Sequence, residues 1–270
     1  MSATGRWAEL VVGPIRASWR AAFGWAITFV LLIVSTVAFW PLFKGSSAID
    51  QALGVLPPAI LKAFGLQDFA TAAGYLRGGL YEIIVPLMFA AAGVMFANSL
   101  VAADEDAGRM ELLLAQPVTR RAFLAARSIS VLAWLAILGI VVLLSQLASD
   151  AVFDLQIGDD RVVATVVLSA LLGAFYAGLA VAVAGFTARP GLVLSVGLGL
   201  ALVGYLVAAL FPLSDVLLPW RQLSPWAWAL SGDPLVNASE PWRYLALAVP
   251  ATALAVIGIL AFERRDIRSA

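Results

Sequence analysis

Cysteine and histidine are both absent from this chain of 270 residues. Without them the chain has no thiolate nucleophile, no Cys/His metal site, and no Ser–His or Cys–His catalytic pair. Charge is scarce as well: 13% of the residues are charged, whereas soluble domains average about 25%. The formal net charge is zero, so the overall balance gives no indication of a nucleic-acid partner.

Lysine is nearly absent too. Lys44 and Lys62 are the only lysines, and neither follows a glycine, as the lysine of a phosphate-binding loop does. No predicted membrane span carries an aspartate near its centre, which argues against an intramembrane aspartyl protease and against an ion-coupled transporter. We therefore expect a chain that is not an enzyme and that binds no cofactor and no metal of its own.

Apolar residues dominate what is present, at 62% of the sequence. A helix crosses a bilayer with about 20 consecutive apolar residues, and six stretches reach that length. The fourth and fifth are separated only by a tight turn, where Pro190 cannot continue the helical hydrogen-bond ladder. We predict an all-α polytopic membrane protein with one six-helix domain over 21–262, with spans at about 21–43, 80–103, 128–148, 162–187, 191–211 and 243–262.

Basic residues set the predicted orientation, because cytoplasmic segments are enriched in Lys and Arg. With the N-terminus inside, the inner segments hold 11 basic residues and the outer segments hold 6. This predicts cytoplasmic N- and C-termini, an interfacial helix over residues 1–20 and a cytoplasmic tail over 263–270. We expect a multi-pass protein of the bacterial cytoplasmic membrane.

Several features of the predicted spans and loops allow more than one interpretation. Glu82, one turn inside the second span, either takes part in proton or cation movement or reaches water at the interface beside Arg77. The acidic loop at 150–160 lacks the residue spacing of a calcium loop, which favours a solvated loop. Gln146 is placed to bond across helices. Small residues spaced by four predict close packing, either within the chain or between subunits; the pairs are Gly173 with Ala177, Ala174 with Gly178, Gly197 with Ala201, and Gly204 with Ala208.

The densest cytoplasmic charge lies in residues 104–121, between the second and third predicted spans. Carboxylates end the second span, Gly108 lets the chain turn under the membrane, and a short apolar helix runs on until Pro117 stops it. Fixed at both ends to membrane helices, such a helix would act as a rigid lever; the alternative is a charged loop whose leucines pack on neighbouring helices. The residues assigned to the lever are Asp104, Glu105, Asp106, Gly108, Arg109, Glu111, Leu112, Leu113, Leu114, Pro117, Val118, Thr119 and Arg120.

This stretch resembles the coupling-helix signature of the membrane subunits of type-2 ATP-binding-cassette exporters. The signature runs acidic-x-acidic-x-Gly-Thr-Leu-Glu-x-Leu-Leu and ends, two or three residues later, in Pro-Val/Ile-Ser/Thr-Arg. The chain departs from it mildly, with Asp104 where Glu is usual, Arg109 where Thr is common and Met110 where Leu is. The outer segment 212–242, rich in proline and tryptophan, carries a second likeness to some bacterial members: Leu223-Ser224-Pro225-Trp226, then Ser231-Gly232-Asp233-Pro234-Leu235.

The resemblance covers essentially the whole chain and implies a permease subunit of a multidrug-type exporter. It implies that two such subunits pair, as a homo- or heterodimer, above two separate cassette ATPases that bind the ATP and Mg. The 104–121 helix would dock in a cleft on each ATPase, Arg189 would make a second contact, and the second and fifth spans would line the cavity. The expected cargo is a small amphiphilic or hydrophobic molecule: a drug, an antibiotic or a lipid-like compound. Two alternatives stay open: an ATPase-coupled membrane assembly or maturation factor, and an ATPase-independent channel or secondary carrier.

Overall fold

The structure, a computed structural model, describes residues 3–57, 60–61, 66, 68–102, 119–187 and 189–264. This part of the chain is helical and contains no strand. Six helical stretches in it are long and apolar enough to cross a membrane: Glu9–Phe43, Ala72–Val101, Arg120–Phe153, Asp159–Thr187, Pro190–Leu213 and Pro241–Arg264. The predicted all-α class is therefore confirmed for the described residues, and six helices have the length and composition that the predicted spans require.

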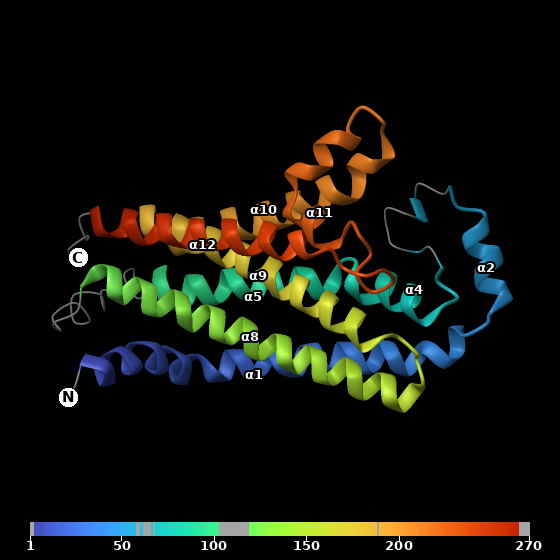
Figure 1. Cartoon of the computed structure of the whole chain (residues 1–270), viewed down its shortest axis with the longest axis horizontal. Helices are drawn as coiled ribbons and strands as arrows, with labels where there is room; N and C mark the ends of the chain where they lie inside the picture. Colours follow the sequence, from blue (N-terminus) through green and yellow to red (C-terminus); the bar gives the residue numbers. More distant parts are fainter. Residues whose placement is uncertain are drawn as a thin grey trace.

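The long helices run back and forth along one bundle axis (Figure 1). The helices α1 and α12 begin and end the described chain at the same end of the bundle, which we call the terminal end. The helices α2 and α4 lie at the opposite end, and α11 lies beside α10, nearer the middle of the bundle. The elements are α1 (Ala3–Phe43), α2 (Ser47–Gly54), α4 (Ala72–Leu76), η1 (Arg77–Tyr81), α5 (Ile84–Ala97), η2 (Asn98–Ala102), α8 (Arg120–Phe153), α9 (Asp159–Thr187), α10 (Pro190–Leu210), η3 (Phe211–Leu213), η4 (Leu218–Leu223), α11 (Pro225–Leu230) and α12 (Pro241–Arg264).

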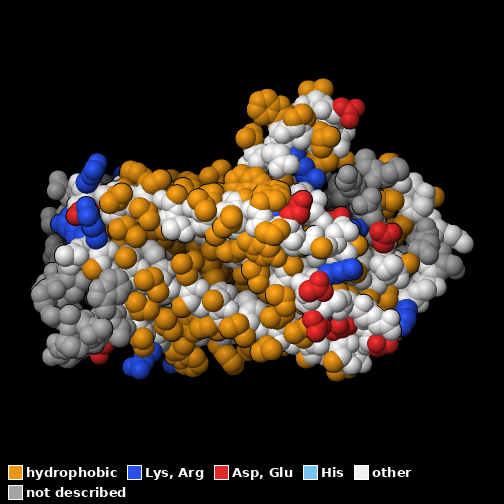
Figure 2. Space-filling model, viewed as in Figure 1, with side chains coloured by type: hydrophobic (Ala, Val, Ile, Leu, Met, Phe, Trp, Pro, Cys, Tyr) orange, Lys and Arg blue, Asp and Glu red, His pale blue; other side chains and the backbone are white. Residues whose placement is uncertain are grey.

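Side chains on the bundle surface follow the pattern of a membrane protein. Hydrophobic side chains form a band over the middle of the face seen in Figure 2, while charged side chains gather towards the two ends. Large apolar residues such as Leu31, Leu206 and Val249 are exposed within the long helices. In water such a surface would be strongly unfavourable, whereas lipid chains accept it.

Helix α1 is one continuous helix of 41 residues. At about 1.5 Å per residue it is roughly 60 Å long, about twice the hydrocarbon thickness of a bilayer. It runs through Gly13 and Pro14 without a break, and the Ser18 hydroxyl donates to the carbonyl oxygen of Pro14 at 2.7 Å. The segment expected as a separate interfacial helix over residues 1–20 is thus joined to the first span in this structure, and its placement on a membrane surface stays a prediction.

The second span is interrupted near Pro86. Proline has no N–H to donate to the carbonyl of Glu82, four residues earlier, and the chain between α4 and α5 adopts the π-helical segment η1. The amide of Glu82 donates to the carbonyl of Arg77 at 2.8 Å, a bond across five residues. A second π-helical segment, η2, follows α5. Arg77 and Glu82 therefore lie at the two ends of this π-helical segment, Arg77 as its first residue and Glu82 as its C-cap.

Helix α9 forms the centre of the bundle. In the most apolar 18-residue stretch of α9, 67% of the residues are buried inside the protein, whereas the corresponding share is 22% for α1 and 22% for α12. Its small residues permit direct backbone contact: a Cβ added at Gly173 would lie 2.7 Å from the carbonyl oxygen of Phe89 in α5, and one at Gly178 would collide with the carbonyl of Ala251 in α12. The small residues of α9 therefore serve packing within the chain.

Two of the glycines of α10 serve the same purpose. A Cβ at Gly197 would lie 2.7 Å from a methyl of Val94 in α5, and one at Gly204 would lie 2.5 Å from the hydroxyl oxygen of Tyr176 in α9. Of the two alternatives that the spacing left open, packing within the chain accounts for Gly173, Gly178 and these two residues. Gln146 also bonds across helices as predicted: its side-chain oxygen accepts a hydrogen bond from the Tyr81 hydroxyl at 3.0 Å.

The segment after α10 is built from short helical pieces, as its prolines predict. Pro212, Pro219 and Pro225 each stand at the first or second position of a short helix, where a missing N–H costs no hydrogen bond. Ser224 caps α11: its hydroxyl oxygen accepts from the amide of Trp226 at 3.2 Å and donates to the carbonyl of Gly204 at 2.6 Å. Trp226 is 1% exposed, so this cap anchors the segment in the bundle.

Candidate functional site

The predicted lever is flanked by described residues at the terminal end. Asp104 to Val118 lie outside the described residues. The last described residue before them, Ala102, ends η2, and the first after them, Thr119, is the N-cap of α8. The Thr119 side-chain oxygen accepts a hydrogen bond from the amide of Ala122 at 3.2 Å. Arg120 is the first residue of α8.

The start of α8 is held firmly in the bundle. Phe123 and Leu124 are 3% and 0% exposed, so the first turn after the cap is anchored by apolar burial. The guanidinium of Arg127 lies 5.0 Å from the centre of the Phe123 ring. Arg121 forms an ion pair with Glu263 of α12, which joins the start of one span to the end of another. Both side chains of that pair are substantially exposed, so its contribution to stability is small.

Arg189, the predicted second contact, lies at the terminal end as well. It is exposed and is the N-cap of α10, followed by Pro190 in the first turn. Its carbonyl oxygen accepts from the amides of Leu192 and Val193, both at 3.0 Å. The start of α10, which Arg189 caps, and the two flanks of the predicted lever thus lie at one end of the bundle (Figure 1).

A second group of charged residues lies at the opposite end, and of its members the sequence predicted only Glu82 and Arg77 to lie together. Arg77 of η1 forms an ion pair with Asp233, which follows α11, with 3.4 Å between Nη1 and Oδ2. The Arg77 side chain is 6% exposed and that of Asp233 is 38% exposed. Asp233 has a φ of 50°, a left-handed conformation that aspartate tolerates better than most residues. The pair ties the second span to the segment that precedes the sixth.

Arg243, near the start of α12, forms hydrogen bonds with the end of α11. Its Nη1 donates to the carbonyl of Trp228 at 3.1 Å and to the Ser231 hydroxyl at 3.0 Å. Its Nε and Nη2 contact a carboxylate oxygen of Glu240 at 3.1 and 3.0 Å. A cation at the carbonyl end of a helix is favourable. Gly232 is packed against the guanidinium, because an added Cβ would lie 2.9 Å from Cζ of Arg243.

Glu82 and Arg221 complete this group. Glu82 interacts electrostatically with Arg77, Arg221 and Asp233, and with Arg77 and Asp233 it lines a small cavity. Burial lowers the pKa of Arg221, while the carboxylates of Glu82 and Asp233 oppose that shift. Glu82 therefore belongs to a mixed cluster of positive and negative charges. A proton or cation role for it stays an untested alternative.

The arrangement at the opposite end is suited to holding helices together. Among the described residues, no group of three or more acidic side chains is placed to hold a metal ion. Of residues 150–160, which were predicted to form an acidic loop, the first belong to the end of α8 and the last to the start of α9; between the two helices Asp154 accepts a hydrogen bond from Gln156 at 3.2 Å. In the sequence, the Asp233-Pro234-Leu235 motif marks one member of the cluster. The motif does not indicate which distant arginine Asp233 contacts.

Replacing Asp233 by asparagine is expected to lower stability, because it leaves the buried Arg77 guanidinium without this counter-charge. Leaving a buried charged group poorly paired costs about 1–3 kcal/mol, and the partial exposure of Asp233 places the loss towards the lower end. The melting temperature of the purified protein in detergent measures it. Asp215→Asn, at an exposed aspartate of the same outer segment, is the matched control; equal shifts in both variants would refute a specific role for the pair.

The sequence matches a known protein family. A family described as "Protein of unknown function (DUF2705)" matches residues 59–268, which include the 104–121 segment and the last five predicted spans. None of the curated proteins matches the chain.

Proposed function

The chain belongs to the DUF2705 family of proteins of unknown function, and from that premise we propose that it is the membrane-spanning permease subunit of an ATP-driven exporter. The family brings no activity with it, so the proposal rests on the chain's own residues. The observation that carries it is the sequence of the segment 104–121, in which acidic residues are followed by a short apolar stretch and a proline between two spans. Six membrane-length helices support it.

The geometry of the terminal end is consistent with force transmission. The flanks of the 104–118 segment are the π-helical end of the second span and the capped start of α8. Because Phe123 and Leu124 are buried directly after that cap, a force on the segment would reach the packed core without being lost in a loose linker. Exposed Arg189 at the same end supplies a further contact for a partner.

The proposed partner is a cassette ATPase in two copies, docked beneath a pair of these permease subunits. ATP and Mg are bound by the partner, whose closure favours one arrangement of the spans over the other. A ligand shifts such an equilibrium only by its differential affinity for the two states. Alternating access of a cavity lined by α5 and α10 would then move an amphiphilic or hydrophobic molecule outwards across the bacterial cytoplasmic membrane.

The first test of the proposal is orientation, and the absence of cysteine from the chain makes it simple. A single cysteine introduced in Ala115→Cys should react with a membrane-impermeant maleimide only after the cells are permeabilised. Val216→Cys, at a residue that is 78% exposed between η3 and η4 in the predicted outer segment, should react in intact cells. The reverse pattern would place the proposed docking segment outside the cell, where no ATPase can reach it, and would refute the proposal.

Transport itself is tested in vesicles that contain the chain with its co-purified ATPase. ATP-dependent accumulation of an amphiphilic dye or a fluorescent lipid analogue is the expected result. Stimulated ATP hydrolysis without movement of a range of such probes would favour the assembly-factor alternative. Movement that persists without any ATPase would favour a channel or secondary carrier. Either of the last two results contradicts the proposed function.

A further inference from the structure

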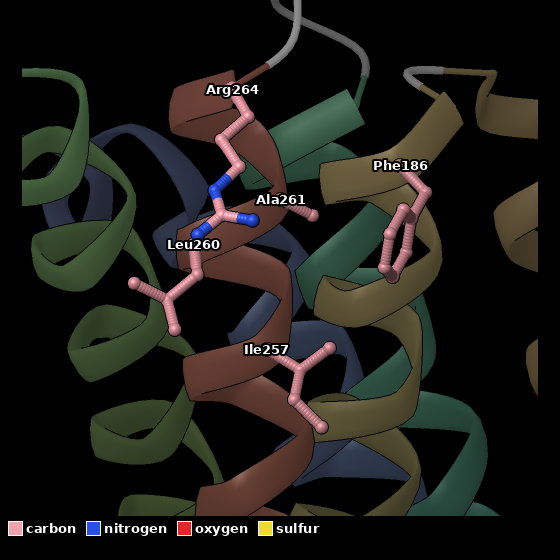
Figure 3. Close-up of a pocket in the computed structure, with 5 residues that line it drawn as sticks. All are labelled: Phe186, Ile257, Leu260, Ala261 and Arg264. Carbon is pink, nitrogen blue, oxygen red and sulfur yellow. The ribbon is translucent and has the colours of Figure 1, made fainter.

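An apolar groove lies between the ends of α9 and α12 at the terminal end. Its volume is about 490 Å³, and it is lined by Phe186, Ile257, Leu260, Ala261 and Arg264. Phe186 projects from the last turns of α9, and the other residues lie on successive turns of α12 (Figure 3). The volume falls in the range of roughly 300–1,000 Å³ that small-molecule sites occupy. Four of the five side chains that line it are apolar.

The apolar part of the groove is open to its surroundings. Phe186 is 61% exposed, Ile257 is 47% exposed and Leu260 is 41% exposed. All three belong to membrane-length helices, so the medium that meets them is lipid. The groove therefore suits an acyl chain lying along the two helices.

Arg264 places a positive charge at the mouth of the groove. Its side chain runs back along α12 towards Leu260 (Figure 3), the direction in which long side chains on a helix usually extend. The neighbouring carboxylate, Glu263, is engaged by Arg121. Arg264 itself forms no ion pair with any residue in the described part of the chain. The guanidinium is therefore available to an anion that arrives with the acyl chain.

The level of Arg264 in the bundle fits a phosphate. Arg264 is the last residue of α12, a helix of 24 residues, and about 20 residues span the hydrocarbon core. The guanidinium thus lies near the headgroup region, where the cytoplasmic leaflet carries its anionic lipids. Arginine can bind a phosphate with two parallel hydrogen bonds, whereas a zwitterionic headgroup also carries a cation that opposes the attraction.

We propose that this groove binds one anionic phospholipid, with an acyl chain against Phe186, Ile257 and Leu260 and the phosphate on Arg264. The site does not require the proposed transport function, because it needs only the described helices and the cytoplasmic placement of the terminal end that the basic residues predict. Its occupant would contact α9 and α12 together, next to the point where their backbones touch at Gly185 and Gly258.

The test compares phosphatidylglycerol with phosphatidylcholine of the same acyl chains, added to the purified full-length chain and detected as retained adducts by native mass spectrometry. One phosphatidylglycerol should be retained on the order of fivefold more tightly, which is the preference expected from one arginine near an anionic headgroup. Arg264→Gln should abolish that preference. Ala261→Trp, which fills the groove, should reduce retention of both lipids.

The matched control is Arg16→Gln, which removes the same charge from an exposed position on α1, on the other side of the bundle from α12 in Figure 1. It should keep the phosphatidylglycerol preference. Equal retention of the two lipids by the unaltered protein would overturn the proposal. So would equal losses in Arg16→Gln and Arg264→Gln, because they would reveal only a general attraction between the chain and anionic lipid. Size-exclusion profiles confirm that each variant remains folded.

Discussion

Glu111→Lys and Leu113→Asp are each expected to abolish stimulation of the partner ATPase while the chain remains folded and inserted. The first reverses a charge and the second places a carboxylate on the apolar face of the proposed docking helix. Disrupting a desolvated charged contact in an interface costs about 2–5 kcal/mol, which corresponds to roughly a 30-fold or larger loss of affinity. Co-purification of the ATPase and its stimulated rate of ATP hydrolysis measure the effect.

Two controls separate docking from general charge effects. Glu9→Lys makes the same charge change at an exposed residue near the start of α1, at the same end of the bundle. Leu113→Met keeps the residue apolar and close in volume. Both should retain the ATPase. If Glu111→Lys and Leu113→Asp also co-purify with an ATPase of unchanged stimulated activity, the 104–121 segment is not the coupling element and the proposed function fails.

Gly185→Ala is expected to cause the largest loss of stability among single-methyl additions to the bundle. At this position the backbones of α9 and α12 touch: a Cβ at Gly185 would collide with the carbonyl of Gly258, and one at Gly258 would lie 2.6 Å from the carbonyl of Val181. Backbone atoms cannot rotate away as a side chain can, so the helices must separate. Overpacking of this kind costs about 1–3 kcal/mol, observed as a lower melting temperature in detergent.

Gly199→Ala is the control for that experiment. It makes the same change in a membrane-length helix, but an added Cβ at Gly199 meets nothing within 4 Å. Alanine is the better helix former, so this variant should be as stable as the unaltered protein or slightly more stable. If the two variants melt at the same temperature, the close approach of α9 and α12 does not contribute to stability as the structure indicates.

The number and type of the long elements could be predicted from the sequence because they depend on local composition. A run of about 20 apolar residues determines a span by itself, and Pro190 marks the turn after α9 without reference to distant residues. The continuity of α1 through Gly13 and Pro14 was not predicted. Glycine and proline both disfavour a helix interior, but in the folded chain α8 packs along α1: the hydroxyl of Ser130 donates to the carbonyl of Val11 at 2.9 Å.

The charged cluster at the opposite end could not be predicted from local composition. Arg77 and Asp233 are far apart in the chain, and their contact depends on how the second span breaks and how α11 is capped. Pro86 cannot continue the helical hydrogen-bond ladder, which accounts for an irregular second span, yet a proline by itself does not specify π-helical turns. The spacing of the small residues was compatible both with packing within the chain and with packing between subunits. Only the packed backbones of α9 with α5 and α12 decide in favour of contacts within the chain.

The two π-helical segments that flank α5 have a geometric consequence. Ile84–Ala97 is a rigid α-helical rod with η1 before it and η2 after it. A π-helical turn accommodates about one residue more than an α-helical turn, so conversion of either segment to α-helix would rotate the rod by about 100° about its own axis and advance it by about 1.5 Å. The second span thus contains, at each end of α5, a segment whose conversion would rotate that helix. The segment η2, at the terminal end, directly precedes residues 103–118.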